Sequence, residues 1–253
     1  MGYLIHNRAF KEIGSNDIYI PFLVDNVEKF FKGFSPYLEG LSVTMPFKED
    51  IISMMDEIDE MATKIGAVNT VVREGKGWKG YNTDCMGALK AIEKHVDLKN
   101  KNVLIIGAGG TAKAIGQGVY EKGAKITVTY NRDKEKGIQL GRELEAKVVS
   151  IQEIDNEEID VLINCSPVGM SPNLEETPIS SRCLRKGMVV FDSVYNPLET
   201  RLIREAKVAG CVTISGVELF VNQAVGQFEL WTRQKAPAEL MRDVVLQGLD
   251  SKI

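Results

Sequence analysis

Histidine, paired cysteines and long apolar runs are what this chain of 253 residues has least of, and each shortage excludes a class of protein. Two histidines are present, His6 and His95, so histidine-based catalysis and a serine, histidine and carboxylate hydrolase are poorly supported. The four cysteines lie far apart and form no C-x-x-C pair, which argues against a zinc site and a disulfide framework. We therefore expect no bound metal.

Concentrated charge is lacking as well. The net charge is -4 and the 31 lysines and arginines are spread along the chain, so no basic patch for nucleic acid or an anionic membrane is expected. The first residues lack the basic segment and apolar core of a signal peptide, and no later apolar run approaches the ~20 residues of a membrane-spanning helix. We expect a cytoplasmic protein, monomeric or homodimeric, that acts on a small molecule.

What the chain does have is an alternation of strand-like and helix-like segments, which is typical of an α/β fold. In the first part of the chain the patterns predict strands over 17–24 and 41–44. They predict helices over 25–34 and over 84–95. A further helix is predicted from Pro46 to about residue 57, since proline suits the first turn of a helix.

A polar stretch, 97–102, precedes a second run of the same alternation, which starts with the buried-strand pattern of 103–106. Further strands are predicted over 126–130, 161–164 and 188–191, and helices up to Gly123, from Asp133, over 216–233 and over 238–247. We expect the last two helices to return to the first domain. The predicted architecture is therefore two α/β domains: a substrate-binding domain, 1–99 plus 216–253, and a Rossmann-like dinucleotide-binding domain, 100–215.

A glycine-rich turn follows the first strand of the second domain. Residues 107–112 fit the G-x-G-x-x-A fingerprint, with a helix expected directly after them. Glycines let the backbone approach a pyrophosphate closely, and the helix N-terminus offers unpaired N–H groups and a positive dipole end. The alternative is a tight turn that binds nothing. The context favours cofactor binding by Gly107, Ala108, Gly109, Gly110 and Thr111.

The end of the next strand bears on which dinucleotide is bound. NAD sites usually carry an acidic residue there, whereas this strand ends in Tyr130, Asn131 and Arg132. A guanidinium can pair with a 2′-phosphate, which favours NADP(H). Arg132 as a solvated charge remains an alternative, and Asp133 could either repel a phosphate or cap the following helix.

Lysine and aspartate form the candidate catalytic pair in the first domain. Reduction of a ketone needs a proton donor as the oxygen becomes an alkoxide, and a lysine held by a carboxylate can supply the proton. Lys48 and Asp84 lie in segments that follow strand-like runs, where open α/β sheets bind ligands. The plainer readings are that Lys48 is a solvated charge and that Asp84 caps a helix.

Eight segments add a stronger signal when taken together and in order: VTMPFK, GAVNT, GYNTD, GAGGTAKA, NRD, INCSPVGM, FDSVYNPLETRLI and GVELFVNQAVGQFELWT. They resemble the shikimate dehydrogenase family, including the dehydrogenase domain of bifunctional dehydroquinate dehydratase/shikimate dehydrogenase, across essentially the whole chain. The resemblance implies NADPH-dependent, reversible reduction of 3-dehydroshikimate to shikimate, a step of chorismate and aromatic amino acid biosynthesis.

The resemblance also implies roles for particular residues. Lys48 and Asp84 match the catalytic pair. The positions that match substrate contacts are Thr44, Asn69, Thr83, Tyr195, Gln223 and Gln227. The positions that match cofactor contacts are Gly107 to Thr111 in the phosphate loop, Asn131 and Arg132 at the 2′-phosphate, and Ser166, Ser193 and Gly216 beside the nicotinamide.

The N-terminus departs from the family pattern. Residues 5–7 resemble the end of a motif whose preceding part supplies two serines for the substrate carboxylate, so those serines and the strand that starts the domain would lie before Met1. A clipped chain, a misassigned start, a piece of a fusion with an upstream dehydratase domain and a genuinely shortened protein are all open explanations.

Two rival functions remain open. The first is a quinate/shikimate dehydrogenase that accepts NAD. Quinate is a related ring acid with one more hydroxyl, so only small changes around the pocket would be needed to bind it. The second is a non-catalytic NADP- or shikimate-binding homologue, suggested by the missing serines. In the favoured hypothesis the dinucleotide delivers hydride while Lys48, oriented by Asp84, assists proton transfer, and the active site is a cleft between the domains that closes over both ligands.

Overall fold

A computed structural model describes residues 1–130 and 133–250, apart from the side chains of residues 155 and 156. By internal contacts the chain forms two compact units, Met1–Met86 with Val221–Ile253, and Gly87–Phe220. We call them the first and the second unit. Their borders fall inside helices α4 (Thr83–Ile92) and α8 (Gly216–Thr232). The predicted domain borders, near residues 100 and 215, both lie within the second unit and stay a prediction.

The first unit is built on a small mixed sheet with the strand order β1-β3-β4-β2. Strand β1 (Gly40–Ser42) runs antiparallel to β3 (Thr70–Glu74), which forms a hairpin with β4 (Gly77–Tyr81), and β2 (Glu57–Ile58) runs parallel to β4. Helix α2 (Val27–Phe34), helix α3 (Glu60–Ile65) and the 3-10 helices η1 (Ser35–Tyr37) and η2 (Asp50–Met54) complete this part. Its core contains Phe31, Ile51, Val68, Val71 and Trp78.

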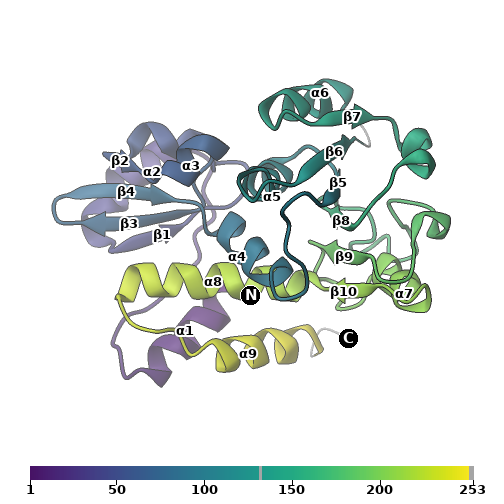
Figure 1. The fold of residues 1–253 in the computed structure, drawn as a ribbon. Coiled ribbons are helices and arrows are strands. Elements are labelled where there is room, and N and C mark those ends of the chain that lie inside the picture. Colours follow the sequence, from purple (N-terminus) through teal and green to yellow (C-terminus); the bar gives the residue numbers. More distant parts are fainter. Residues whose placement is uncertain (131–132, 251–253) are drawn as a thin grey trace. The chain divides into compact units, whose positions relative to one another are not determined.

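Helices from both ends of the chain share this unit. Helices α1 (Gly2–Glu12) and α9 (Ala238–Asp250) pack side by side (Figure 1). The ring of Phe10 lies 5.2 Å from that of Phe228 in α8, and both side chains are buried. The expectation that the C-terminal helices return to the first part of the chain is therefore confirmed.

Two elements predicted for this unit are wrong. Residues 17–24, all of them described, form no strand: Pro21 lacks an N–H, and the backbone of Tyr19 bonds the side-chain amide of Asn7 instead of a neighbouring strand. The helix predicted from Pro46 to residue 57 is a turn followed by η2, because the N–H of Asp56 bonds the Trp78 carbonyl and draws the chain into the sheet at β2. Helix α2 begins at Val27, two residues after the predicted start, because the side chain of Asn26 caps it.

The second unit contains a six-stranded parallel sheet with the order β10-β9-β8-β5-β6-β7. Its strands are β5 (Asn102–Ile106), β6 (Lys125–Thr129), β7 (Lys147–Val149), β8 (Val161–Asn164), β9 (Val189–Asp192) and β10 (Val212–Ile214). Helices α5 (Gly110–Glu121), α6 (Lys134–Glu143) and α7 (Arg201–Val208) connect them, with short 3-10 helices η3 (Ile151–Asn156) and η4 (Ser181–Cys183). The predicted Rossmann-like α/β fold is confirmed, and the strand order reverses between β5 and β8.

Alternating side chains of β5 show why these strands read as continuous apolar runs. Val103 and Ile105 belong to one core cluster, whereas Leu104 and Ile106 belong to another. Because helices cover both faces of a parallel sheet, both sets of side chains must be apolar. The sheet therefore leaves polar chemistry to the ends of its strands.

Candidate active site

Lys48 and Asp84 form an ion pair in the first unit. The Nζ atom of Lys48 donates to Oδ2 of Asp84 at 2.6 Å, and the side chains are only 20% and 14% exposed. The plain reading of Asp84 as a helix cap is wrong, because Oδ1 of Asn82 accepts from the backbone N–H groups of Asp84 and Cys85 at the start of α4. The carboxylate of Asp84 is thus left to Lys48.

One backbone segment, 67–69, anchors both partners. The N–H of Val68 donates to the carbonyl of Lys48 at 2.8 Å, which fixes the turn that carries the lysine. The side chain of Asn82 donates to the carbonyl of Ala67 at 2.9 Å, which fixes the start of α4 and with it Asp84. The same piece of backbone therefore positions two side chains that lie 36 residues apart in the sequence.

Asn69 ends this segment with its side-chain amide in a set orientation. Its Oδ1 atom accepts from the Thr83 N–H at 2.8 Å, from the Thr83 hydroxyl at 3.2 Å and from the Thr70 hydroxyl at 2.7 Å. An oxygen that receives three donors cannot be exchanged with the amide nitrogen, so the assignment follows from the network. The Nδ2 group remains as the donor that Asn69 can offer to a ligand.

Gln227, predicted to contact substrate, is bound within the fold at both ends of its amide. Its Nε2 atom donates to the Ser42 hydroxyl at 3.0 Å, the Thr70 hydroxyl at 3.1 Å and the Asn69 carbonyl at 3.3 Å. Its Oε1 atom faces Nε2 of His6 at 3.3 Å. A substrate contact by Gln227 would have to replace one of these bonds, and the role stays a prediction.

His6 is a buried neighbour of this network. Its ring stacks on that of Tyr19, with 5.0 Å between centroids, and is 1% exposed. Because Oε1 of Gln227 can only accept, Nε2 of His6 carries the proton. Burial lowers the pKa of His6 to about 4, so the ring is neutral at pH 7.

The remaining substrate-site predictions fall in different places. Thr83 is fully buried, Thr44 is exposed, and Gln223 is half-buried one helical turn before Gln227. Tyr195 belongs to the second unit, where its ring lies 4.9 Å from that of Phe220. The structure thus collects Lys48, Asp84, Asn69, Thr83 and Gln227 through contacts within one unit. The substrate role of Tyr195, in the other unit, stays a prediction.

The glycine loop of the second unit has the geometry that a pyrophosphate requires. Gly107 has φ +109°, and a Cβ there would lie 3.2–3.3 Å from backbone atoms of Cys165 and Ser166. Apart from the adjoining backbone, no described atom lies within 4 Å of where a Cβ on Gly109 or Gly110 would stand, so the backbone there is open to a ligand. The first turn of α5, fully described, holds no acidic side chain. These residues fit a dinucleotide phosphate at a helix N-terminus.

Polar residues at the ends of β8 and β9 flank this loop. The Ser166 hydroxyl donates to Oδ1 of Asn164 at 2.7 Å, and the Ser193 N–H donates to the Asn164 carbonyl at 2.9 Å. A Cβ on Gly216 would lie 2.5 Å from the Val194 carbonyl, so this position requires glycine. The predicted residues Ser166, Ser193 and Gly216 therefore lie in packed loops, and their cofactor contacts stay predictions.

Asp192 is a buried polar residue that the sequence analysis did not single out. It is 0% exposed, and burial raises its pKa to about 6, although hydrogen bonds from Thr200, Val194 and Asn164 act in the opposite direction. An acidic residue at the carboxyl end of an apolar strand was the available signal. Its neighbour Cys165 has its pKa raised by burial and by Asp192, so it stays a thiol.

Asn131 and Arg132, the predicted 2′-phosphate contacts, lie outside the described residues. Asp133 is described, and its Oδ1 atom accepts from the Lys136 N–H at 3.0 Å as the N-cap of α6. Of the two readings left open for Asp133, the helix cap is confirmed.

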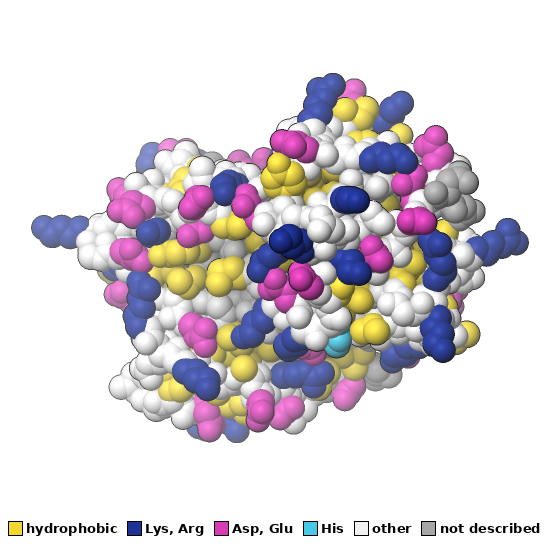
Figure 2. Space-filling view, in the orientation of Figure 1, with side chains coloured by type: hydrophobic (Ala, Val, Ile, Leu, Met, Phe, Trp, Pro, Cys, Tyr) yellow, Lys and Arg dark blue, Asp and Glu magenta, His cyan; other side chains and the backbone are white. Residues whose placement is uncertain are grey.

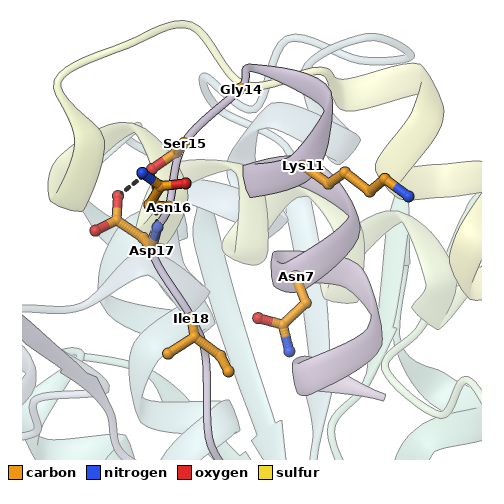
Figure 3. A pocket seen from close by; sticks show the side chains of 7 residues that line it. All are labelled: Asn7, Lys11, Gly14, Ser15, Asn16, Asp17 and Ile18. Carbon is orange, nitrogen blue, oxygen red and sulfur yellow. Dashed lines mark hydrogen bonds between the residues drawn. The ribbon is translucent and has the colours of Figure 1, made fainter.

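A shallow groove of about 490 Å³ lies elsewhere on the first unit, between α1 and the residues that follow it (Figure 3). Asn7 lines it, but both ends of the Asn7 amide are bound to the Tyr19 backbone. Ser15 and Asp17 bond to each other. Since neither Lys48 nor Asp84 lines it, this groove is not the candidate active site.

Surface and membrane features are unremarkable in the described part of the chain. On the face drawn in Figure 2, basic and acidic side chains are interspersed. No helix within 1–130 and 133–250 is both long and apolar enough to cross a membrane. The same residues contain no group of three histidine, cysteine or acidic side chains arranged to hold a metal ion.

Family comparisons cover most of the chain. The shikimate dehydrogenase substrate binding domain matches residues 2–71, the shikimate/quinate 5-dehydrogenase domain matches 89–197, and the shikimate 5′-dehydrogenase C-terminal domain matches 216–246.

Individual relatives agree with these matches. Shikimate dehydrogenase (NADP(+)) of Methanosarcina acetivorans is 40% identical, over 98% of this chain and 93% of its own length. The chloroplastic bifunctional 3-dehydroquinate dehydratase/shikimate dehydrogenase of Arabidopsis thaliana is 42% identical over 94% of this chain, but the match spans 42% of that longer protein. A crystal structure of a shikimate dehydrogenase in complex with NADP+ has a TM-score of 0.92 at 35% identity, covering 98% of this chain and 91% of that one.

Proposed function

This chain belongs to the shikimate dehydrogenase family, and we propose that it is an NADP-dependent oxidoreductase that interconverts 3-dehydroshikimate and shikimate, with Lys48 and Asp84 as its proton-transfer pair. The reaction places it in the shikimate pathway. We place it in the cytoplasm as a monomer or homodimer that needs no metal. The dehydratase activity in the name of the plant relative is not carried over, because the match covers less than half of that protein.

The observation that carries the proposal is the sheltered ion pair of Lys48 and Asp84. The two charged groups lie 2.6 Å apart, and neither side chain is more than 20% exposed. The carboxylate of Asp84 therefore holds the ammonium group of Lys48 in one position. When bound, NADPH supplies the hydride that reduces the ring ketone. Lys48 donates a proton to the ketone oxygen as negative charge develops there, and it takes the proton back from the hydroxyl in the reverse direction.

Substrate recognition by the first unit fits a polyhydroxylated ring acid. Three donors occupy the Oδ1 atom of Asn69, which leaves its Nδ2 group to donate to a ring hydroxyl. Thr44 and Gln223 add a hydroxyl and an amide to the polar groups assigned to substrate. A site built from fixed hydrogen-bonding groups discriminates strongly against analogues that lack the matching hydroxyl.

Cofactor recognition is assigned to the second unit. The open backbone at Gly109 and Gly110 and the start of α5 receive the pyrophosphate. Asn131 and Arg132 are assigned to the 2′-phosphate, and Ser166, Ser193 and Gly216 to the nicotinamide side.

The test is to follow nicotinamide absorbance with the purified protein and shikimate or quinate, each with NADP+ or NAD+. We expect turnover with shikimate and NADP+, and weaker turnover in the other three pairs. Comparable turnover with quinate and NAD+ would replace the proposal with a quinate/shikimate dehydrogenase. No turnover in any pair, with NADPH still bound, would favour the non-catalytic homologue.

A further inference from the structure

The carboxyl ends of β8 and β9 meet around the buried carboxylate of Asp192. Its Oδ1 atom accepts from Nδ2 of Asn164 at 2.9 Å and from the Val194 N–H at 3.0 Å. Its Oδ2 atom accepts from the Thr200 hydroxyl at 2.6 Å. Burying a carboxylate costs free energy unless hydrogen-bond donors replace the lost water. These three donors are therefore held in place around Asp192.

Each donor belongs to a different segment. Asn164 ends β8, and its own Oδ1 accepts from the N–H and the hydroxyl of Ser166, which fixes the loop after β8. Val194 lies in the loop after β9. Thr200 is the N-cap of α7 and accepts from the Ile203 N–H at 3.3 Å. One carboxylate therefore connects two loops and the start of a helix.

These loops border the glycine loop. Strand β8 pairs with β5, and backbone atoms of Cys165 and Ser166 lie where a Cβ on Gly107 would meet them. The Val194 carbonyl likewise closes on Gly216. The edge involved is the carboxyl end of a parallel sheet at the point where its order reverses, which is where such sheets bind ligands.

We propose that Asp192 is a positioning residue for the dinucleotide: by bonding Asn164, Val194 and Thr200 it holds the loops after β8 and β9 against the glycine loop in the geometry that binds NADPH. The naming of NADPH rests on the proposed function. Asp192 itself does not touch the ligand. Burial raises the pKa of Asp192, which means that the charged carboxylate is costly to bury at this position. An uncharged side chain would be easier to bury there. A carboxylate at such a position is expected when its hydrogen bonds fix the geometry of the loops rather than add stability.

The experiment compares NADPH affinity, by fluorescence titration without substrate, among variants of this network. Thr200→Val removes the donor to Asp192, whereas Thr200→Ser keeps the hydroxyl. Asp192→Asn keeps the shape and removes the charge. Asp160→Asn is the control. Asp160 also accepts a backbone hydrogen bond, from the Asn102 N–H at 2.9 Å, but it lies where β5 begins, at the end of the sheet opposite the carboxyl ends of the strands.

We expect Thr200→Val and Asp192→Asn to raise the Kd for NADPH about tenfold, since a lost bond to a buried charge is worth at least that factor. Thr200→Ser and Asp160→Asn should stay within about twofold of the wild type. In steady-state assays the first two variants should raise the KM for NADPH and largely recover kcat at saturating NADPH. General destabilisation would instead lower the active fraction, and a melting curve on each variant separates the two effects.

Wild-type affinity in both Thr200→Val and Asp192→Asn would overturn the proposal, and so would an equal loss of affinity in Asp160→Asn. If Asp192→Asn does not fold, the comparison of Thr200→Val with Thr200→Ser decides. The affinity pattern without shikimate turnover would leave the positioning role standing while the proposed function fails. A wild-type protein that does not bind NADPH would overturn both.

Discussion

The two compact units build their buried polar networks from different groups. In the first unit, neutral amides, hydroxyls and an uncharged histidine connect α1, β1, β3, α4 and α8 through Gln227 and Asn69. In the second, a carboxylate at the end of β9 collects its donors. Parallel strands bring their ends to one edge, where backbone and side-chain donors can surround a charge, whereas the mixed sheet distributes its polar residues over several elements. The units should therefore respond differently to substitution and to pH.

Replacement of Lys48 should have the largest effect and should leave the second unit untouched. Lys48→Ala is expected to lower kcat by about 10²-fold or more, the usual contribution of a positioned proton donor. NADPH affinity should be unchanged, because the cofactor residues lie in the other unit. Stopped-time or continuous absorbance assays with shikimate and NADP+ measure the first quantity, and fluorescence titration the second.

The matched control for that experiment is Lys32→Ala on α2. Lys32 lies at the same 2.6 Å from a carboxylate, that of Glu28, but its side chain is 74% exposed. Exposed pairs contribute little, so this variant should match the wild type. Unchanged turnover in Lys48→Ala, or an equal loss in Lys32→Ala, would contradict the role of the buried pair.

Core truncation should separate the stabilities of the two units. Phe228 in the first unit and Phe191 in the second are each 0% exposed, and replacing either by alanine is expected to cost about 3–5 kcal/mol. Both tryptophans, Trp78 and Trp231, lie in the first unit, so their fluorescence reports on it while circular dichroism reports on both. In urea, Phe228→Ala should move the fluorescence midpoint more than Phe191→Ala does. Identical shifts by both probes in both variants would mean that the units unfold as one.

His6 and Asp192 should give the two units opposite pH dependences, the smallest of these effects. Burial lowers the pKa of His6 from 6.5 to about 4, so the unfolded chain binds the extra proton first as pH falls. The stability that a neutral His6 contributes is complete above pH 6.5 and is lost between pH 6.5 and 4, by on the order of 3 kcal/mol. Urea titrations by tryptophan fluorescence should show this slope, and His6→Gln should remove it.

For Asp192 the sign is reversed. Its pKa rises from 3.8 to about 6 on burial, so the folded chain holds a proton that the unfolded chain has released. Stability from this group is greatest below pH 3.8 and falls as pH rises to about 6, again by on the order of 3 kcal/mol. Circular dichroism melts of Asp192→Asn should lack this fall. A wild-type slope in that variant would show that another group is responsible.

The sequence predicted the second unit better than the first for a physical reason. Strands covered on both faces are continuous apolar runs, so β5, β8 and β9 were located to within a residue or two. In the first unit, residues 17–24 have the composition of a strand but pair with no strand among the described residues. Residues 46–57 begin with a proline that suits a helix, but the N–H of Asp56 bonds the Trp78 carbonyl in the sheet. Local pattern cannot report a competing partner elsewhere in the chain.

The same division applies to the site. The sequence by itself determined the family, the parallel Rossmann-like fold, the glycine loop and the choice of Lys48 and Asp84 as candidates, because these depend on residue type and order. Only the tertiary structure decided that Asn82 rather than Asp84 caps α4, that three donors fix the Oδ1 atom of Asn69, that Gln227 is bound at both ends, and that Asp192 joins two loops. Those facts depend on which donors and acceptors meet after folding, and hydrogen bonds between distant segments leave no periodic trace in a sequence.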